Sequence, residues 1–214
     1  MMNEFVKIRN EKLAEKVVKN LKERHFEAYY CENKQQALEK AVSLIPKDGT
    51  VSWGGTMSVA EIGLFDYLKE NGYKCIDRNA AKSDEERAQI LKEATFADTF
   101  LMSSNAVSYD GELVNIDGTG NRVAAMIFGA KSVVMVVGMN KLAPTLADAV
   151  TRAKTVASPI NSQRFSGRKS PCCITGICAN CKSEDSICVH EVITRISRPA
   201  GRIKIILVNE DLGF

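Results

Sequence analysis

The sequence predicts a single α/β domain over residues 1–214, built on an open, mostly parallel sheet with helices on both faces. Strand-like and helix-like segments alternate along the first half of the chain, as they do when helices connect parallel strands. The run KSVVMVVG (131–138) is apolar from Val133 onward, which is typical of a central strand covered on both faces. No repeat, low-complexity linker or shift in composition marks a domain boundary. We therefore interpret the cysteine-rich segment at about 171–190 as an insertion.

Helices in the first half are indicated by apolar spacing and by their end signals. Apolar residues recur at helical spacing over 13–21, and Asn33 is a residue type that caps the next helix, which ends at the turn signal PKDG. A helix over 56–72 ends at the stop signal Asn-Gly, and a helix over 83–94 opens with a capping-box pattern. Between them, strands are predicted at 25–32, 50–55, 73–77 and 99–104.

The second half adds a hairpin to this alternation. AVSYDGELVNI (106–116) turns on Asp110-Gly111, a strong hairpin signal. Further helices are predicted at 121–130 and about 144–156, and the last strand is RIKIILVNE (202–210).

Charge and apolar patterning exclude several classes of protein. The 29 Lys and Arg interleave with 26 Asp and Glu for a net charge of +3, so there is no basic tract for nucleic acid. No run of about 18 apolar residues is present, and no secretory signal opens the chain. We expect a cytoplasmic protein with reduced thiols and without a membrane span; its size is compatible with a homodimer.

Five of the seven cysteines fall in PCCITGICANCKSEDSICVH (171–190). Cys173, Cys178, Cys181 and Cys188 follow a spacing used by plant-type ferredoxins, and four thiolates also suit tetrahedral zinc. The spacing therefore predicts a metal site holding an iron–sulfur cluster or zinc, without deciding between them. Cys172 is a spare ligand, and His190 is able to replace a thiolate.

Two readings of these cysteines without metal stay open. Cysteine is a frequent core residue, so the segment is also consistent with reduced, partly buried thiols that have no ligand role. Cys178 and Cys181 form a CxxC pair, which redox-active dithiols use as well.

Two glycine loops, each between a predicted strand and a helix, form the second candidate site. SWGGTMS contains Gly54, Gly55 and Thr56, and NIDGTGNR contains Gly118, Thr119, Gly120, Asn121 and Arg122. If both follow strands of one parallel sheet, they meet at its carboxyl edge, where free N–H groups bind anions. Arg122 adds a bidentate anion contact. The loops predict a site for an anionic small molecule, although such loops are also common as plain turns.

Few residues are candidates for catalysis. Glu61, Asn115 and Asp117 lie near the glycine loops and suit acid–base or orienting work, or else ordinary capping. With two histidines in the chain, no Ser-His-Asp arrangement is supported.

The combined motifs resemble the LUD (lactate utilisation) domain family over most of the chain. The resemblance rests on VSWGGTMSVAEIG, on SSNAVSYDGELVNIDGTGNRVAAMIFGAKSVVMVVG, and on PCCITGICANCKSEDSICVHEVI with the terminal RIKIILVNEDLGF. It implies a fold similar to that of the sugar-phosphate isomerases and coenzyme A transferases. It also implies a role in oxidising L-lactate to pyruvate beside redox partner subunits of iron–sulfur complexes. This chain departs from the short members of the family by carrying its own C-terminal cysteines.

Three hypotheses about function follow. The first is an iron–sulfur electron-transfer or accessory subunit in the oxidation of lactate or a related organic acid. The second is a non-redox transferase or isomerase that binds a phosphorylated or coenzyme A-linked acid, with structural zinc or metal-free cysteines. The third is a binding protein without turnover, which the short list of catalytic candidates keeps open.

Overall fold

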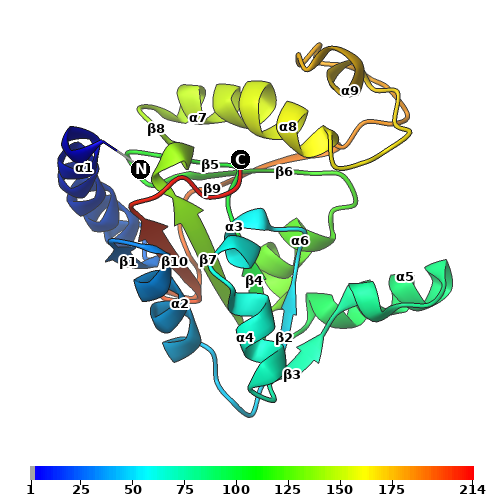
Figure 1. Cartoon of the computed structure of the whole chain (residues 1–214), viewed down its shortest axis with the longest axis horizontal. Coiled ribbons are helices and arrows are strands. Elements are labelled where there is room, and N and C mark those ends of the chain that lie inside the picture. Colours follow the sequence, from blue (N-terminus) through cyan, green and yellow to red (C-terminus); the bar gives the residue numbers. More distant parts are fainter. Residues whose placement is uncertain (1–2) are drawn as a thin grey trace.

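The structure, a computed structural model, describes residues 3–214 and contains two sheets (Figure 1). The larger has the strand order β1-β10-β7-β4-β2-β3, and all of its neighbouring strands pair in parallel. Its strands are β1 (Glu27–Cys31), β2 (Thr50–Trp53), β3 (Lys74–Ile76), β4 (Thr99–Met102), β7 (Ser132–Gly138) and β10 (Ile203–Val208). The predicted parallel sheet is confirmed, and β7 lies inside it with buried residues on both faces.

Helices cover both faces of this sheet, as the sequence predicted. Alternate side chains of β7 divide between two apolar cores, with Val133 and Met135 in one and Val134 and Val136 in the other. The first core includes α1 (Glu4–Glu23), α6 (Asn121–Ala124) and the π-helical turn η2 (Ala125–Gly129). The second includes α2 (Lys34–Ser43), α3 (Met57–Glu61) and α4 (Leu64–Glu70). Two cysteines outside the cysteine-rich segment are part of this packing: Cys31 of β1 is buried in the second core, and Cys75 of β3 packs against it.

The helix predicted over 56–72 is broken in two. Gly63 has φ of 75°, a left-handed conformation that ends α3 and begins α4. α3 starts at the Thr56 cap, shortly after β2 ends, and Phe65 of α4 stacks on Trp53 with ring centroids 4.7 Å apart. Trp53 is therefore a core residue.

The next helix, α5 (Asp84–Thr95), begins after its cap Ser83 as predicted and follows a short turn, η1 (Arg78–Ala80).

A second, smaller sheet has the order β8-β5-β6-β9. It contains β5 (Ala106–Ser108), β6 (Leu113–Asp117), β8 (Leu142–Ala143) and β9 (His190–Thr194). The predicted hairpin is confirmed as the antiparallel pair β5–β6. The pairing of β6 with β9 was not predicted, because β9 follows the cysteine segment and lacks a turn signal of its own.

One long helical run covers the small sheet instead of the main one (Figure 1). It comprises α7 (Leu146–Arg152), the π-helical turn η4 (Ala153–Ala157) and α8 (Ser158–Ser162). Its Ala149 and Ala153 pack on Ala106 and Val114. The segment with α9 (Pro171–Thr175) projects beyond α8 and returns to the small sheet as β9, so the predicted insertion joins these two elements. Within residues 3–214, no helix is both long and apolar enough to cross a bilayer.

Gly129 is a point at which the packing of the helix layer tolerates no side chain. A Cβ atom there would lie 2.1 Å from the backbone oxygen of Thr95 at the end of α5. Gly129→Ala is therefore expected to lower the free energy of unfolding by roughly 1–3 kcal/mol or more, as overpacking does. Denaturant unfolding measures this loss of stability. The control is Ala124→Ser, because Ala124 is exposed on the neighbouring helix. Equal midpoints for the two variants would count against this packing.

Candidate functional site

A cavity of about 70 Å³, here called the anion pocket, lies at the carboxyl edge of the main sheet. Loops that follow three parallel strands line it: Gly55–Met57 after β2, Ser103–Asn105 after β4, and Lys141 beyond β7. The tail after β10 contributes Gly213 and Phe214. Ligands of open α/β sheets bind at this edge, outside the carboxyl ends of the strands.

Lys141 is the cation of this pocket. Its side chain is buried, with 3% of the residue exposed, and Nζ donates hydrogen bonds to Ser58 Oγ (2.9 Å) and Ser103 Oγ (3.0 Å). No ion pair joins it to a carboxylate of residues 3–214. Burial, and then the positive charges of Arg152 and Arg122, lower the pKa of Lys141 to about 7, against a weaker opposing effect of Glu61. An anion that enters the pocket would pair with this ammonium group.

This pKa makes anion binding depend on pH. Lys141 attracts an anion only while it is charged, so affinity for a small carboxylic acid is expected to be full below pH 7. Above pH 7 the affinity falls by about tenfold per pH unit, until the pH reaches the pKa that Lys141 has in the complex. The stability of the free protein has the opposite trend. The pKa of Lys141 is about 7 in the folded protein and 10.5 in the unfolded chain. As pH rises from 7 to 10.5, the buried Lys141 is neutral while the unfolded chain still binds the proton, so the free energy of unfolding increases. Calorimetric titrations at pH 6, 7, 8 and 9 test the first trend; constant affinity would exclude Lys141 as the anchor.

Arg122 also lines the anion pocket, but its donors are used inside the protein. Its guanidinium donates to Asn115 Oδ1 (2.8 Å), Ile116 O (2.6 Å), Ser103 O (3.3 Å) and Asn105 Oδ1 (3.3 Å), and Nε pairs with Asp117 Oδ2 at 3.4 Å. The expected bidentate contact with a ligand is therefore not available in this arrangement. Arg122 contributes its charge and ties β6 to the loop after β4.

Asn115 and Asp117, predicted as catalytic candidates, belong to this network. Asn115 is fully buried and orients Arg122. Asp117 accepts from the Gly120 N–H at 2.8 Å and pairs with Arg122. Both side chains thus hold the loop after β6. The third candidate, Glu61, is exposed; its Oε2 accepts from the Gly213 N–H at 2.9 Å and fixes the tail that closes the pocket.

The two glycine loops meet only at Arg122 and do not form one site as expected. Gly55 and Thr56 line the pocket, and Gly54 lies behind it against Arg122, where a Cβ atom would be 2.9 Å from Cδ. The second loop follows β6, which belongs to the small sheet, so the expectation of two loops on one sheet was wrong. Of that loop, Arg122 lines the anion pocket.

The rest of the second loop lies beside the cysteine segment. A Cβ atom on Gly118 would be 3.3 Å from Ile187 O, and one on Gly120 would be 3.1 Å from His190 Nε2. Thr119 is exposed, and Asn121 begins α6. The predicted role of these residues in binding an anion stays a prediction.

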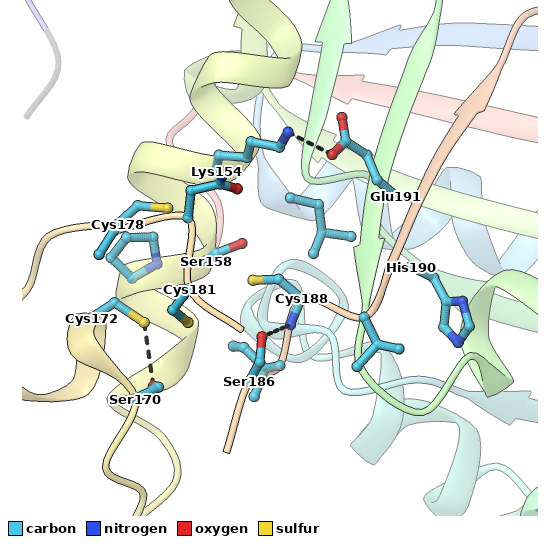
Figure 2. Close-up of a pocket in the computed structure, with 16 residues that line it drawn as sticks. Lys154, Ser158, Ser170, Cys172, Cys178, Cys181, Ser186, Cys188, His190 and Glu191 are labelled. Atoms are coloured by element: carbon cyan, nitrogen blue, oxygen red, sulfur yellow. Dashed lines mark hydrogen bonds and ion pairs between the residues drawn. The ribbon is translucent and has the colours of Figure 1, made fainter. Parts of the chain in front are cut away.

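A second cavity, of about 180 Å³, brings cysteines together and is here called the thiol cavity. Cys172, Cys178, Cys181 and Cys188 line it, with Ser158 of α8 among them (Figure 2). The ion pair Lys154–Glu191 (2.8 Å) also borders it. His190 lines the cavity too, but its ring turns away from the sulfurs (Figure 2).

Cys172, which the sequence left as a spare, lines this cavity, whereas Cys173 does not. Neighbouring residues of α9 point in different directions. The Cys173 sulfur instead contacts Ser170 Oγ (3.2 Å) and Ser162 O (3.6 Å). Burial acts to raise the pKa of the Cys172 thiol, but hydrogen bonds from Ser162, Ser170 and the backbone outweigh it, so the pKa is lowered.

The donor chemistry of the thiol cavity fits a thiolate-bound metal, while its present geometry is open. All of the described cysteines are free thiols. In residues 3–214, no three His, Cys, Asp or Glu side chains are close enough to hold a metal ion as they stand. Residues 176–189, which carry three of the cavity cysteines, contain neither helix nor strand, and Asn180 between Cys178 and Cys181 has φ of 48°. A metal would therefore have to draw this loop inward.

The two cavities share a wall. Ile116 of β6 lines both, and its backbone oxygen accepts the Arg122 hydrogen bond on the pocket side. Sequence reasoning found the thiols and the first glycine loop but missed Lys141, Ser58 and Ser103. The position of Lys141 could have predicted it: the residue comes shortly after the apolar strand β7, so it lies at the carboxyl edge of the sheet.

Comparison with known proteins adds a family and a fold. The LUD domain family model matches residues 14–208. A DUF162 family protein from Deinococcus radiodurans superposes with a TM-score of 0.55 at 10% identity, covering 93% of this chain and 98% of that one. No curated protein matches the chain.

Two further solved structures match over about half of the chain. Ribose 5-phosphate isomerase A from Neisseria gonorrhoeae has a TM-score of 0.34 and 20% identity, covering 53% of this chain and 54% of that one. The eIF2B delta of Chaetomium thermophilum has a TM-score of 0.34 and 18% identity, covering 55% and 50%.

Proposed function

The chain belongs to the LUD domain family, and on that premise we propose that it takes part in the oxidation of lactate or a related small organic acid. In this proposal the acid's carboxylate pairs with Lys141 in the anion pocket, and the thiol cavity holds an iron–sulfur cluster. The chain is then an electron-transfer or accessory subunit that works with redox partner subunits.

The observation that carries the proposal is the shared wall at Ile116. A pocket with a buried, unpaired lysine lies next to a cavity lined by free thiols, within one chain. An organic-acid site and a redox centre need such proximity, whereas purely structural thiols do not.

The residues of the anion pocket suit a small acid. Its volume of about 70 Å³ is far below the several hundred Å³ of pockets for drug-sized ligands, so a molecule of few heavy atoms fits best. Ser58 and Ser103 hold the Lys141 ammonium in place through its hydrogen bonds. Arg122, fixed by Asn115 and Asp117, adds a second positive charge nearby without moving.

The thiol cavity supplies the ligands of the proposed cluster. Cys172, Cys178, Cys181 and Cys188 would hold it, because these are the cysteines that line the cavity. When bound, an iron–sulfur cluster exchanges electrons at a potential set by its hydrogen bonds and exposure. Ser170 Oγ lies 3.5 Å from Cys172 Sγ, within reach of a sulfur of the proposed site, whereas the Ser158 hydroxyl donates to Ala153 O.

Calorimetric titration of the anaerobically purified chain with L-lactate and with pyruvate tests the acid-binding part. We expect saturable binding of at least one of the two acids, and binding that is lost in Lys141→Met. Absence of any heat of binding for both acids at millimolar concentration would refute the proposed substrate class.

A non-redox transferase or isomerase with a zinc-clamped cysteine segment is the alternative. The unpaired Lys141 favours it equally, because that side chain would bind the anionic group of any substrate. Zinc without iron in the thiol cavity, together with binding of a phosphorylated or coenzyme A-linked acid, would favour this alternative.

A further inference from the structure

Two arginines, Arg78 and Arg164, meet at the rim of the anion pocket, and the positive charge of a third, Arg87, acts on Arg78. Arg78 lies in η1 after β3, Arg87 in α5, and Arg164 just beyond α8. Arg164 Nη1 donates to Gly55 O and to Asn161 Oδ1, both at 3.3 Å, and Gly55 and Asn161 line the pocket. The folded chain thus brings Arg78 and Arg164 together at the glycine loop after β2, and the charge of Arg87 acts on Arg78.

These guanidinium groups lack negatively charged partners. No ion pair within residues 3–214 includes any of the three. The Nε atom of Arg78 is buried and has no hydrogen-bond acceptor. Burial, and then the charges of Arg87 and Arg164, lower the pKa of Arg78, only partly offset by Asp77 and Asp117. The cluster therefore has unused donors and unbalanced positive charge.

Gly55 allows this approach because it has no side chain. A Cβ atom there would lie 2.9 Å from Arg78 Nη2 and 3.7 Å from Arg164 Nη1. The two guanidinium groups thus face the same backbone position, at the point where a ligand would enter the pocket. Paired guanidinium forks match the tetrahedral oxygens of phosphate better than a lysine ammonium does.

We infer that Arg78 and Arg164 bind a phosphate group carried by a small organic molecule at the rim of the anion pocket. This site is separate from the proposed lactate anchor, since it uses neither Lys141 nor the thiols. A molecule with both a carboxylate and a phosphate would engage the two sites together, with its carboxylate at Lys141.

Titrations with inorganic phosphate and with phosphoglycolate at low salt test the inference. Arg78→Gln and Arg164→Gln are each expected to weaken the binding of both probes by roughly 10- to 100-fold, the loss of a charge-assisted hydrogen-bond pair. Arg195→Gln, which removes the same charge at an exposed site after β9, is the matched control and should bind normally. Tighter binding of phosphoglycolate than of phosphate would identify an organic phosphate as the ligand. Equal affinities for the two probes would overturn the organic phosphate as the ligand and would indicate a site for free phosphate.

Gly55→Ala tests the geometry without changing any charge. The new Cβ meets the end of the flexible Arg78 side chain, so the protein should fold while the guanidinium is displaced. We expect phosphate affinity to fall about as far as in Arg78→Gln. Normal phosphate affinity in Gly55→Ala and in both arginine variants would overturn the inference.

Lys141→Met separates this inference from the proposed function. It should abolish the binding of lactate or pyruvate and leave the affinity for inorganic phosphate unchanged, whereas Arg78→Gln should do the reverse. Loss of both affinities in each variant would show one shared site and overturn the separate phosphate site. Phosphate binding without any binding of lactate or pyruvate would refute only the proposed substrate.

Discussion

Lys141→Met is expected to weaken pyruvate binding by about 30- to 5,000-fold, because removing one partner of a buried, hydrogen-bonded charge pair costs about 2–5 kcal/mol. The variant leaves the ligand's carboxylate buried in a pocket without its cation. The folded protein should not suffer, since an apolar side chain of similar length replaces a buried charge, and Ser58 Oγ and Ser103 Oγ already lie 3.4 Å apart. Calorimetric titration gives the affinity, and denaturant unfolding gives the stability.

Lys12→Met is the matched control for this experiment. Lys12 is exposed on α1, so its replacement removes the same charge away from the pocket. Pyruvate affinity is expected to match that of the unmodified protein in this control. A similar loss of affinity in both variants would mean that net charge, and not the buried ammonium, attracts the acid.

Cys181→Ser is expected to remove the metal from the protein purified without oxygen, and Cys172→Ser should do the same. A hydroxyl is a poor substitute for a thiolate toward iron–sulfur clusters or zinc. Because the metal would hold residues 176–189 in place, its loss should also lower the thermal unfolding midpoint. Metal analysis and thermal unfolding of each variant provide the measurements.

Cys173→Ser offers an internal control in the same segment. The Cys173 sulfur lies outside the thiol cavity, next to Ser162 and Ser170, so this variant should keep its metal. Loss of metal in Cys173→Ser with retention in Cys172→Ser would instead support the ligand set that the cysteine spacing predicted.

The main sheet was predictable because its residues carry local signals. The apolar run of β7, the caps at Asn33 and Ser83, and the Asp110-Gly111 turn each specify an element, and the structure has all of them. The strands of the small sheet were harder to combine. The pairing of β6 with β9 joins residues 73 to 81 positions apart, and no local pattern records such a contact.

The sequence predicted those parts of the candidate site in which the backbone geometry requires a particular residue type. The Gly55 loop was found because glycine marks a close approach at a strand end. Cys172 and Cys173 are adjacent in sequence, and their different surroundings are set by the direction of α9 and by Ser162 and Ser170. Lys141 was missed because its buried position depends on hydrogen bonds to Ser58, in α3, and to Ser103, in the loop after β4.

The iron, acid-labile sulfide and zinc content of the chain purified without oxygen tests the central claim most directly. The account predicts iron with sulfide and a visible absorption band, all retained in Cys173→Ser and lost in Cys181→Ser. Zinc without iron, or no metal in the unmodified protein, would contradict an iron–sulfur centre beside the anion pocket.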